Sequence, residues 1–174
     1  MSENALLDEI TNCPHVQQCL KDAAHENPCR EIVESQANLG VMKFQVPEPW
    51  SGQIDTAPIL FLSSNPSIGF DEIYPTQDWS SEEVYDYFNH RFGGGRKAWV
   101  VNGTKSLRTD GTYGRATKFW AAVRKRAEEL LQRDVIPGVD YALTEIVHCK
   151  SRSEIGINQA QAQCVQAYLR RMLG

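Results

Sequence analysis

The run from Pro58 to Ser67 constrains the fold more than any other part of the sequence. It begins with four consecutive apolar residues, Ile59 to Leu62, which is typical of a strand buried on both faces of a sheet. A turn of small residues follows directly. Because open α/β sheets hold ligands in the crevice beyond the carboxyl ends of their strands, we expect a binding site at this turn.

Asn65 is the candidate functional residue of the turn. Ser64 and Ser67 are small and Pro66 has a fixed φ, so the backbone can approach a ligand. The Asn65 amide then offers both a donor and an acceptor. Ser-Asn-Pro is also ordinary turn chemistry, and this purely structural alternative stays open.

Length and composition bound the class of protein. A chain of 174 residues with 41% hydrophobic and 23% charged residues is typical of one globular domain with a substantial core. No apolar stretch approaches the roughly 20 residues that span a bilayer. The amino-terminal residues lack the pattern of a secretory signal. We therefore expect a single domain over residues 1–174 and a cytoplasmic location.

The charge is distributed unevenly along the chain. The formal net charge is −4, but residues 1–88 hold 3 basic and 15 acidic side chains, whereas residues 89–126 hold 10 basic and 1 acidic. Aromatic residues are interleaved with the basic ones, a combination that suits a surface for nucleic-acid backbone and bases. A solvated helix face with a flexible loop is the alternative.

Hydrophobic periodicity and breakers predict the order of elements. Helices are expected within 3–25, with Pro14 starting the second, from 81 to near Gly93 after a Ser80 cap, and over 115–133 and 158–173. Strands are expected at 58–63, 99–101 and 141–147, with a strand or extended segment at 39–46 and a loop at 47–57. The alternation indicates an α/β core over 58–174 with parallel pairing, preceded by a helical and extended arm over 1–57.

Three segments, taken in order, carry a resemblance to a known family. Residues 63–67, Ser-Ser-Asn-Pro-Ser, are similar to a Gly-x-Asn-Pro-Gly turn in which both glycines are serine here. Residues 113–120 resemble a segment that ends in Asn-Arg-Phe-Trp, and residues 141–150 resemble a Thr-Asn-Val-Val-Lys-Cys strand. The chain from about residue 58 to 172 thus resembles the uracil-DNA glycosylase superfamily, in its mismatch-specific, single-strand-selective and iron–sulfur branches.

The resemblance implies a fold, an activity and a site. The fold is a three-layer α/β/α domain with a short central, mainly parallel sheet. The activity is hydrolysis of the N-glycosidic bond of a damaged base flipped out of single-stranded or mismatched duplex DNA. Asn65 would position the attacking water. The resemblance and the basic segment together suggest base contacts at Ser64, Pro66, Phe70, Tyr113 and Glu145, and DNA-backbone contacts at Arg96, Lys97, Lys105, Arg108 and Arg115.

The sequence also departs from the family pattern. Glu145 stands where the family reads uracil with asparagine, and an ionised glutamate only accepts hydrogen bonds. It would suit a base edge that offers donors, such as an amino group, or a structural role beside Thr144. The family's further strands and its His-Pro-Ser loop have no counterpart after the last helix. These departures favour a catalytically inactive nucleic-acid-binding or interaction protein of the same fold, and the Gly93–Gly95 loop leaves a nucleotide-binding α/β protein as a third alternative.

The five cysteines have two interpretations. In a cytoplasmic chain they are expected to be reduced, so they either ligate metal or are buried free thiols. The resemblance to the iron–sulfur branches implies a [4Fe–4S] cluster held by thiolates. Cys149 and Cys164 are similar to the family's second pair of ligands, and the first pair would come from Cys13, Cys19 and Cys29, with Cys13 and Cys19 preferred.

Overall fold

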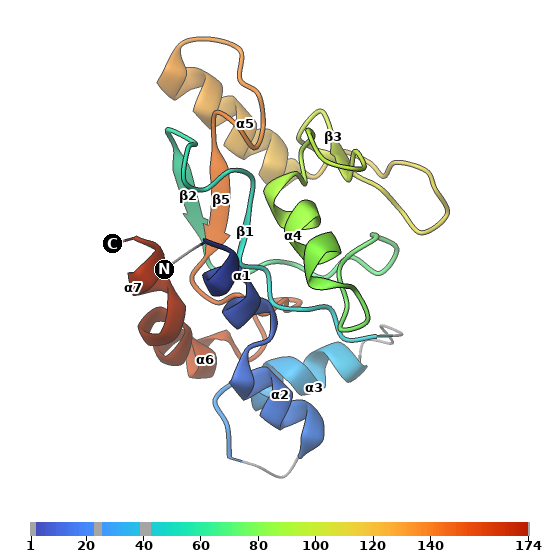
Figure 1. Ribbon diagram of the computed structural model, residues 1–174, viewed down its shortest axis with the longest axis vertical. Coiled ribbons are helices and arrows are strands. Elements are labelled where there is room, and N and C mark those ends of the chain that lie inside the picture. Colours follow the sequence, from blue (N-terminus) through green and yellow to red (C-terminus); the bar gives the residue numbers. More distant parts are fainter. Residues whose placement is uncertain (1–2, 23–25, 39–42, 174) are drawn as a thin grey trace.

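The computed structural model describes residues 3–22, 26–38 and 43–173, which combine helices with small mixed sheets (Figure 1). The expected extended segment at 39–46 therefore lies partly outside the described residues. The elements are α1 (Glu3–Thr11), α2 (Pro14–Lys21), α3 (Arg30–Asn38), β1 (Trp50–Ser51), β2 (Leu60–Ser63), α4 (Ser81–Asn89), β3 (Val100–Val101), β4 (Lys105–Ser106), α5 (Lys118–Leu131), β5 (Ala142–Glu145), α6 (Ile157–Cys164), the π-helix η1 (Val165–Leu169) and α7 (Arg170–Met172).

The main sheet has the strand order β1-β5-β2. Strands β2 and β5 are parallel, with Leu60 opposite Ala142 and Ser63 opposite Glu145, so the expected parallel pairing is confirmed. Strand β2 lies at the edge of the sheet and Leu62 is 46% exposed, so the expectation that this strand is buried on both faces is wrong. Strand β1 pairs with β5 in the antiparallel direction, so the expectation of a mainly parallel sheet is wrong: the sheet is mixed. The parallel register brings the carboxyl ends of β2 and β5 together.

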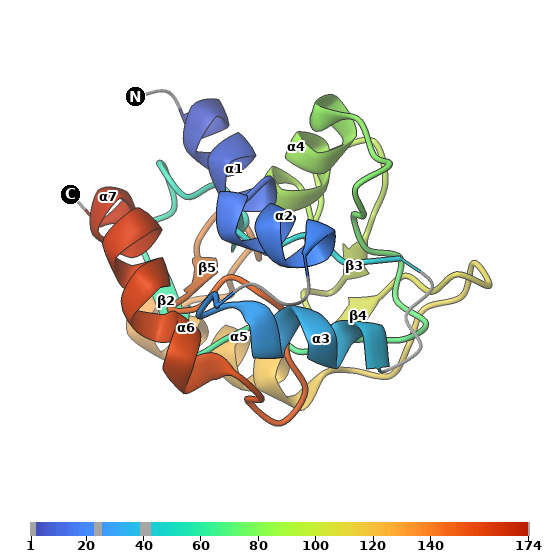
Figure 2. The same ribbon diagram turned by 90° about the horizontal axis from the view of Figure 1, so that it is seen from below.

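Helices cover both faces of the sheet. Leu143 packs in one hydrophobic cluster with Val123 and Ala127 of α5. The next residue, Thr144, points to the opposite face, where its hydroxyl lies 3.9 Å from the sulfur of Met172 in α7. Figure 2 shows the α6–α7 segment beside β2.

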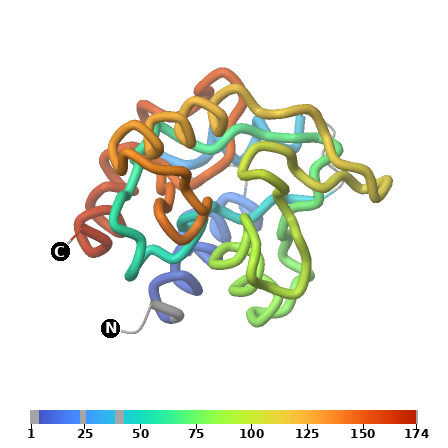
Figure 3. Tube along the Cα trace, turned by 90° about the horizontal axis from the view of Figure 1, so that it is seen from above, coloured from blue at the N-terminus to red at the C-terminus, as the bar shows by residue number. Residues whose placement is uncertain are grey.

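The amino-terminal helices belong to the main core. A larger hydrophobic cluster joins apolar side chains of α1, α2 and α3 to those of α4, α6 and the segment after β5. At the chain ends, the Arg171 guanidinium contacts the Glu9 carboxylate at 2.7 Å, which holds the carboxyl-terminal helix beside α1 (Figure 3). Residues 3–22 and 26–38 are thus packed into the fold rather than set apart as an arm.

Several boundaries differ from expectation. The Ser80 cap is confirmed as a capping box with Glu83, but α4 ends at Asn89, before the glycine loop. Helix α3 and the two-residue strands β1 and β4 were not predicted, and η1 widens the last helix into a π-helix. No helix within residues 3–22, 26–38 or 43–173 is both long and apolar enough to cross a membrane.

Candidate active site

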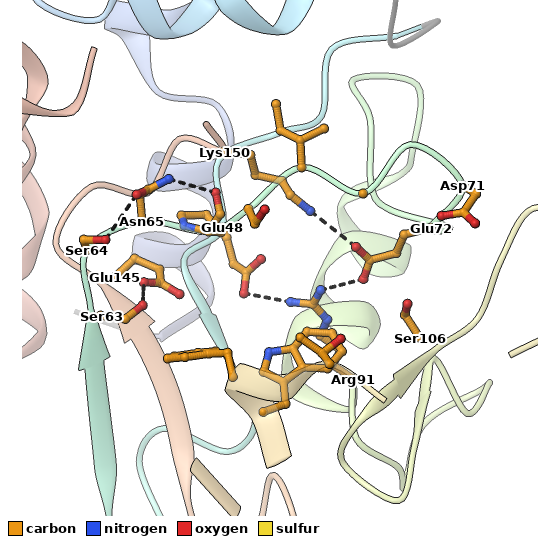
Figure 4. A pocket seen from close by; sticks show the side chains of 17 residues that line it. Glu48, Ser63, Ser64, Asn65, Asp71, Glu72, Arg91, Ser106, Glu145 and Lys150 are labelled. Atoms are coloured by element: carbon orange, nitrogen blue, oxygen red, sulfur yellow. Dashed lines mark hydrogen bonds and ion pairs between the residues drawn. The ribbon is translucent and has the colours of Figure 1, made fainter. Parts of the chain in front are cut away.

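A cavity of about 370 Å³ opens where β2 and β5 end. Its polar side is formed by Glu48, Glu72, Glu145, Arg91 and Lys150, which come from distant parts of the chain (Figure 4). Phe119 and Trp120 at the start of α5 form an apolar wall. The cavity lies at the carboxyl end of the parallel strand pair, which is the usual place for a ligand in an α/β sheet.

Asn65 lies on the rim of this cavity with its amide fixed by the main chain. Its Nδ2 donates to the carbonyl oxygens of Pro66 at 3.0 Å and Ser151 at 3.2 Å. Both amide hydrogens are used, so the side-chain orientation is determined and the carbonyl oxygen Oδ1 remains as the group that can accept. Asn65 is therefore a positioned acceptor rather than a freely rotating amide.

The hydroxyl of Ser64 has two acceptors within reach. It lies 3.2 Å from Asn65 Oδ1 and 3.0 Å from Glu154 Oε1. A hydroxyl has one hydrogen to donate, and an ionised carboxylate is the stronger acceptor. When Ser64 donates to Glu154, Asn65 Oδ1 keeps its lone pairs for a water or a ligand.

Two buried cations bind two of the three glutamates that line the cavity. Arg91 contacts Glu48 through Nη1 and Glu72 through Nη2, each at 2.7 Å, and it is 2% exposed. Lys150 Nζ lies 3.6 Å from Glu72 and 3.4 Å from the centre of the Tyr74 ring. Burial favours a raised pKa for Glu72, but Lys150 and then Arg91 outweigh it and hold that pKa below its ordinary value.

Glu145 has a different environment from Glu48 and Glu72. It forms no ion pair within the described part of the chain, and its one recorded hydrogen bond comes from the Ser63 hydroxyl to Oε2. Burial, reinforced by the nearby charge of Glu48, raises the pKa of Glu145 to about 8. This environment favours the protonated carboxyl at neutral pH, whereas the sequence led us to expect an ionised glutamate.

Glu145 and His148 give the folding stability a defined pH dependence. Burial lowers the pKa of His148 to about 4. Because the folded state raises the pKa of Glu145, its stabilisation is complete below the unfolded value and is lost as pH rises through the folded value. The stabilisation by neutral His148 is instead lost as pH falls from about 6.5 towards 4. Below pH 6.5 the contributions of Glu145 and His148 to the pH dependence of folding stability have opposite signs. Above pH 6.5 the contribution of Glu145 is the larger.

Glu145→Gln should remove the alkaline part of this dependence. Between pH 6.5 and 8 the wild type should lose about 2 kcal/mol of unfolding free energy, which the variant should retain because an amide does not titrate. Urea denaturation followed by circular dichroism at both pH values measures the difference. Glu31→Gln, on the exposed side of α3, should keep the wild-type slope. An unchanged slope in Glu145→Gln would contradict the assignment.

The structure brings together some of the site residues proposed from sequence. Ser64, Asn65, Pro66 and Glu145 all line the cavity. Phe70 does not, although its neighbours Gly69 and Asp71 do; its side chain is 54% exposed beside the opening.

Tyr113 also lies outside the cavity lining, because its hydroxyl donates to the carbonyl of Ala98 at 2.8 Å. The aromatic wall comes instead from Phe119 and Trp120, which sequence reasoning placed in the basic segment without assigning them to the pocket. Glu48, Glu72, Arg91 and Lys150 were missed as site residues; a polar cluster of this kind carries no local sequence signal.

The residues proposed to contact the DNA backbone fall into two groups, those that already have a partner within the protein and those that form no ion pair in the part of the chain that the structure describes. Arg96 forms an exposed ion pair with Glu82, Arg108 lies 3.0 Å from Asp71, and Lys97 lies over the Trp99 ring. Lys105 and Arg115 are exposed and form no ion pair within the described residues. Arg91, included in the basic segment by its charge, is buried in the cavity network and presents no charge to the surface.

The five cysteines are buried in the same hydrophobic cluster. Burial raises the pKa of Cys149 well above its ordinary value, with further increases from neighbouring thiols. Besides burial, Cys164, Cys13 and Cys19 also raise the pKa of Cys29, and Cys13 raises that of Cys164. No group of three or more His, Cys, Asp or Glu side chains in the described ranges is arranged to hold a single metal ion.

Comparisons of this chain with protein-family models, with curated proteins and with solved structures found no match.

Proposed function

We propose that this protein binds an extruded nucleotide of DNA in the cavity and hydrolyses the N-glycosidic bond of its base. The observation that carries the proposal is the juxtaposition, in one cavity, of the anchored Asn65 amide and the Glu145 carboxyl at the ends of adjacent parallel strands. Helices on both faces of this sheet also suit the three-layer glycosylase-like arrangement that the sequence resemblance implies.

In this mechanism Asn65 acts by positioning. Its Oδ1 accepts a hydrogen bond from a water and aligns that water with C1′ of the sugar. The water oxygen bonds to C1′ and releases one proton to solvent, while the C1′–N bond breaks. The electron pair of that bond leaves with the base, which takes up a proton from solvent. An amide is too weak a base to take the water proton early, so the chain relies on alignment and on stabilising the departing base.

Aromatic and basic residues around the opening suit the rest of the nucleic acid. Phe119 is 45% exposed and can stack on a base at the cavity wall. Lys105, Arg115 and Lys118 are exposed nearby on β4, before α5 and at its start. They supply positive charge for phosphates on a protein whose overall charge is negative.

The buried thiols support an iron–sulfur cluster as part of the proposal. Four cysteine thiolates are the usual ligands of a [4Fe–4S] cluster, and all five buried cysteines lie in one hydrophobic cluster. In this proposal Cys29 replaces Cys19 in the first pair of ligands, because Cys164, next after burial, contributes to the raised pKa of the Cys29 thiol. The thiols would have to move together to bind the cluster, since the described residues hold no preformed metal site. A bound cluster would link the residues just before α2 and α3 to α6 and the segment after β5.

Protein purified anaerobically should then show an absorption band at about 400 nm. Cys29→Ser should abolish the band because it removes a ligand, whereas Cys19→Ser should keep it. Iron analysis of each variant provides the second measurement. Colourless, iron-free protein, or equal loss of the band in both variants, would contradict this assignment and leave buried free thiols.

Base excision is tested with labelled oligonucleotides that carry uracil, hypoxanthine or xanthine, as single strands and as mismatched duplexes. Alkali cleaves any abasic site that forms, so shortened strands report excision. Product from at least one of these substrates is expected. Binding of the oligonucleotides without abasic product would contradict the proposed glycosylase activity.

That outcome would instead support the second candidate function, a catalytically inactive nucleic-acid-binding protein, which the exposed Lys105, Arg115 and Lys118 favour. For single strands, the logarithm of the binding constant should fall with the logarithm of salt concentration by about 0.7 for each phosphate contacted. Lys118→Gln should reduce this slope, whereas Lys21→Gln on α2 should not. A slope that Lys118→Gln leaves unchanged would remove Lys118 from the interface.

A further inference from the structure

The charges around the cavity leave one carboxyl without a cation. Arg91 spans Glu48 and Glu72, and Lys150 adds a second positive charge beside Glu72. The two cations therefore neutralise the carboxylates of Glu48 and Glu72. Glu145, only 5% exposed, forms no ion pair within the described residues.

The hydrogen-bond donors are divided in the same way. Glu48 accepts from Arg91 at 2.7 Å, Ser51 at 3.0 Å and Tyr74 at 3.2 Å. Three donors stabilise a carboxylate. Glu145 receives the Ser63 hydroxyl alone and faces the negative charge of Glu48, while Arg91 and Lys150 act on it only from a distance. The environment therefore stabilises the neutral form of Glu145.

The contact with Ser63 engages one oxygen of Glu145, Oε2, and leaves Oε1 free of it. When the Ser63 hydroxyl donates to Oε2, the proton of the neutral acid lies on Oε1. Figure 4 shows the second oxygen of Glu145 turned away from Ser63 and into the cavity. The cavity thus presents a hydrogen-bond donor at the end of β5.

We propose that Glu145 acts as a neutral acid that donates a hydrogen bond from Oε1 to a ring carbonyl of the bound base, which selects oxo bases over amino bases. This inference rests on the proposed function, because it assigns the class of base that the same cavity accepts. An exocyclic amino group would place a donor against a donor and leave both unpaired in a buried site. An ionised carboxylate would reverse the preference, so the bound proton is what determines selectivity.

Free uracil and free cytosine are suitable probes because they differ only along one edge of the ring: uracil has a carbonyl oxygen and N3–H where cytosine has an amino group and an N3 acceptor. Calorimetric titration of the whole chain at pH 6.5 should show uracil binding at least tenfold more tightly than cytosine. At pH 9 the wild type should bind uracil about tenfold more weakly, because a group with a pKa of about 8 is then mostly ionised.

Glu145→Gln is the matched variant, since its amide is neutral at both pH values and can donate through nitrogen. It should keep uracil affinity within about threefold of the wild type at pH 6.5 and should lack the additional loss at pH 9. Ionisation of uracil itself affects both proteins equally, so the difference between them reports Glu145. Circular dichroism verifies that each protein is folded.

Three results would overturn the inference: cytosine binding as tightly as uracil at pH 6.5, an equal alkaline loss in the wild type and Glu145→Gln, or no binding of either base. The excision assay is a separate test. Selective binding of free uracil without excision from DNA would support the role of Glu145 and contradict the proposed glycosylase activity. Excision without selective base binding would support the glycosylase activity and contradict the role of Glu145.

Discussion

Replacing Arg91 with methionine should destabilise the fold by about 3–5 kcal/mol, because removing one partner of a buried ion pair leaves the other charge uncompensated. Arg91 neutralises both Glu48 and Glu72 and lies over the rings of Tyr74, Tyr87 and Trp120. Methionine fills similar volume but supplies no charge. Urea denaturation at pH 7 measures the loss, which is a large part of the roughly 5–15 kcal/mol that stabilises a typical domain.

Arg96→Met provides the matched control. Arg96 also pairs with a glutamate, Glu82, but both side chains are exposed, and such pairs contribute only about 0–1 kcal/mol. Combining Arg91→Met with Glu48→Gln should recover part of the stability, because the uncompensated charge of Glu48 is then gone while Glu72 keeps Lys150 as its partner. Equal effects of Arg91→Met and Arg96→Met would show that burial of the network does not control its energetics.

Asn65→Ala should lower the rate of base excision by about 10²–10³, the cost typical of losing one positioned polar group in an active site. The variant removes the Oδ1 acceptor that aligns the water, along with the amide bonds to Pro66 and Ser151. Single-turnover excision kinetics measure the effect. Basic side chains still contact the phosphates and aromatic side chains still stack on the bases. The dissociation constant for an oligonucleotide should therefore change less than threefold.

Asn158→Ala, at an exposed asparagine of α6, should leave the rate unchanged. Circular dichroism verifies that Asn65→Ala is folded. If Asn65→Ala excises at the wild-type rate, the water-positioning role is wrong even if the protein proves to be a glycosylase. If it loses oligonucleotide binding in parallel with the rate, Asn65 contributes to binding rather than to alignment.

The elements with strong local signals could be predicted from sequence. The spacing of Val123, Ala127 and their neighbours predicted α5, and the continuous apolar run predicted β2. The serines and glutamates of residues 80–83 predicted a capped helix start, and the structure adds that Ser80 and Glu83 form a capping box. Helix α3 and strand β1 were missed because α3 follows Asn27-Pro28 and β1 is two residues long in a proline-rich segment, so tertiary contacts rather than local pattern form them.

Only part of the candidate site could be predicted from the sequence. Asn65 and Glu145 follow apolar strands, and the rule for carboxyl ends of parallel strands placed them together. Arg91 meets Glu48 and Glu72, which are 43 and 19 positions away in the chain, and no short-range pattern encodes such contacts. The raised pKa of Glu145 could not be foreseen from sequence, because it depends on burial and on Glu48, both products of the complete fold.

The central position of β5 also has a consequence for biosynthesis. Trp50 pairs with Thr144 and Leu60 with Ala142, so both flanking strands find their partner more than 80 residues later. A nascent chain on the ribosome carries β1 and β2 as unpaired edges until Ala142 to Glu145 has emerged, and closing these long loops makes sheet assembly a late step. Polypeptides interrupted before Ala142 should therefore depend on chaperones and aggregate without them.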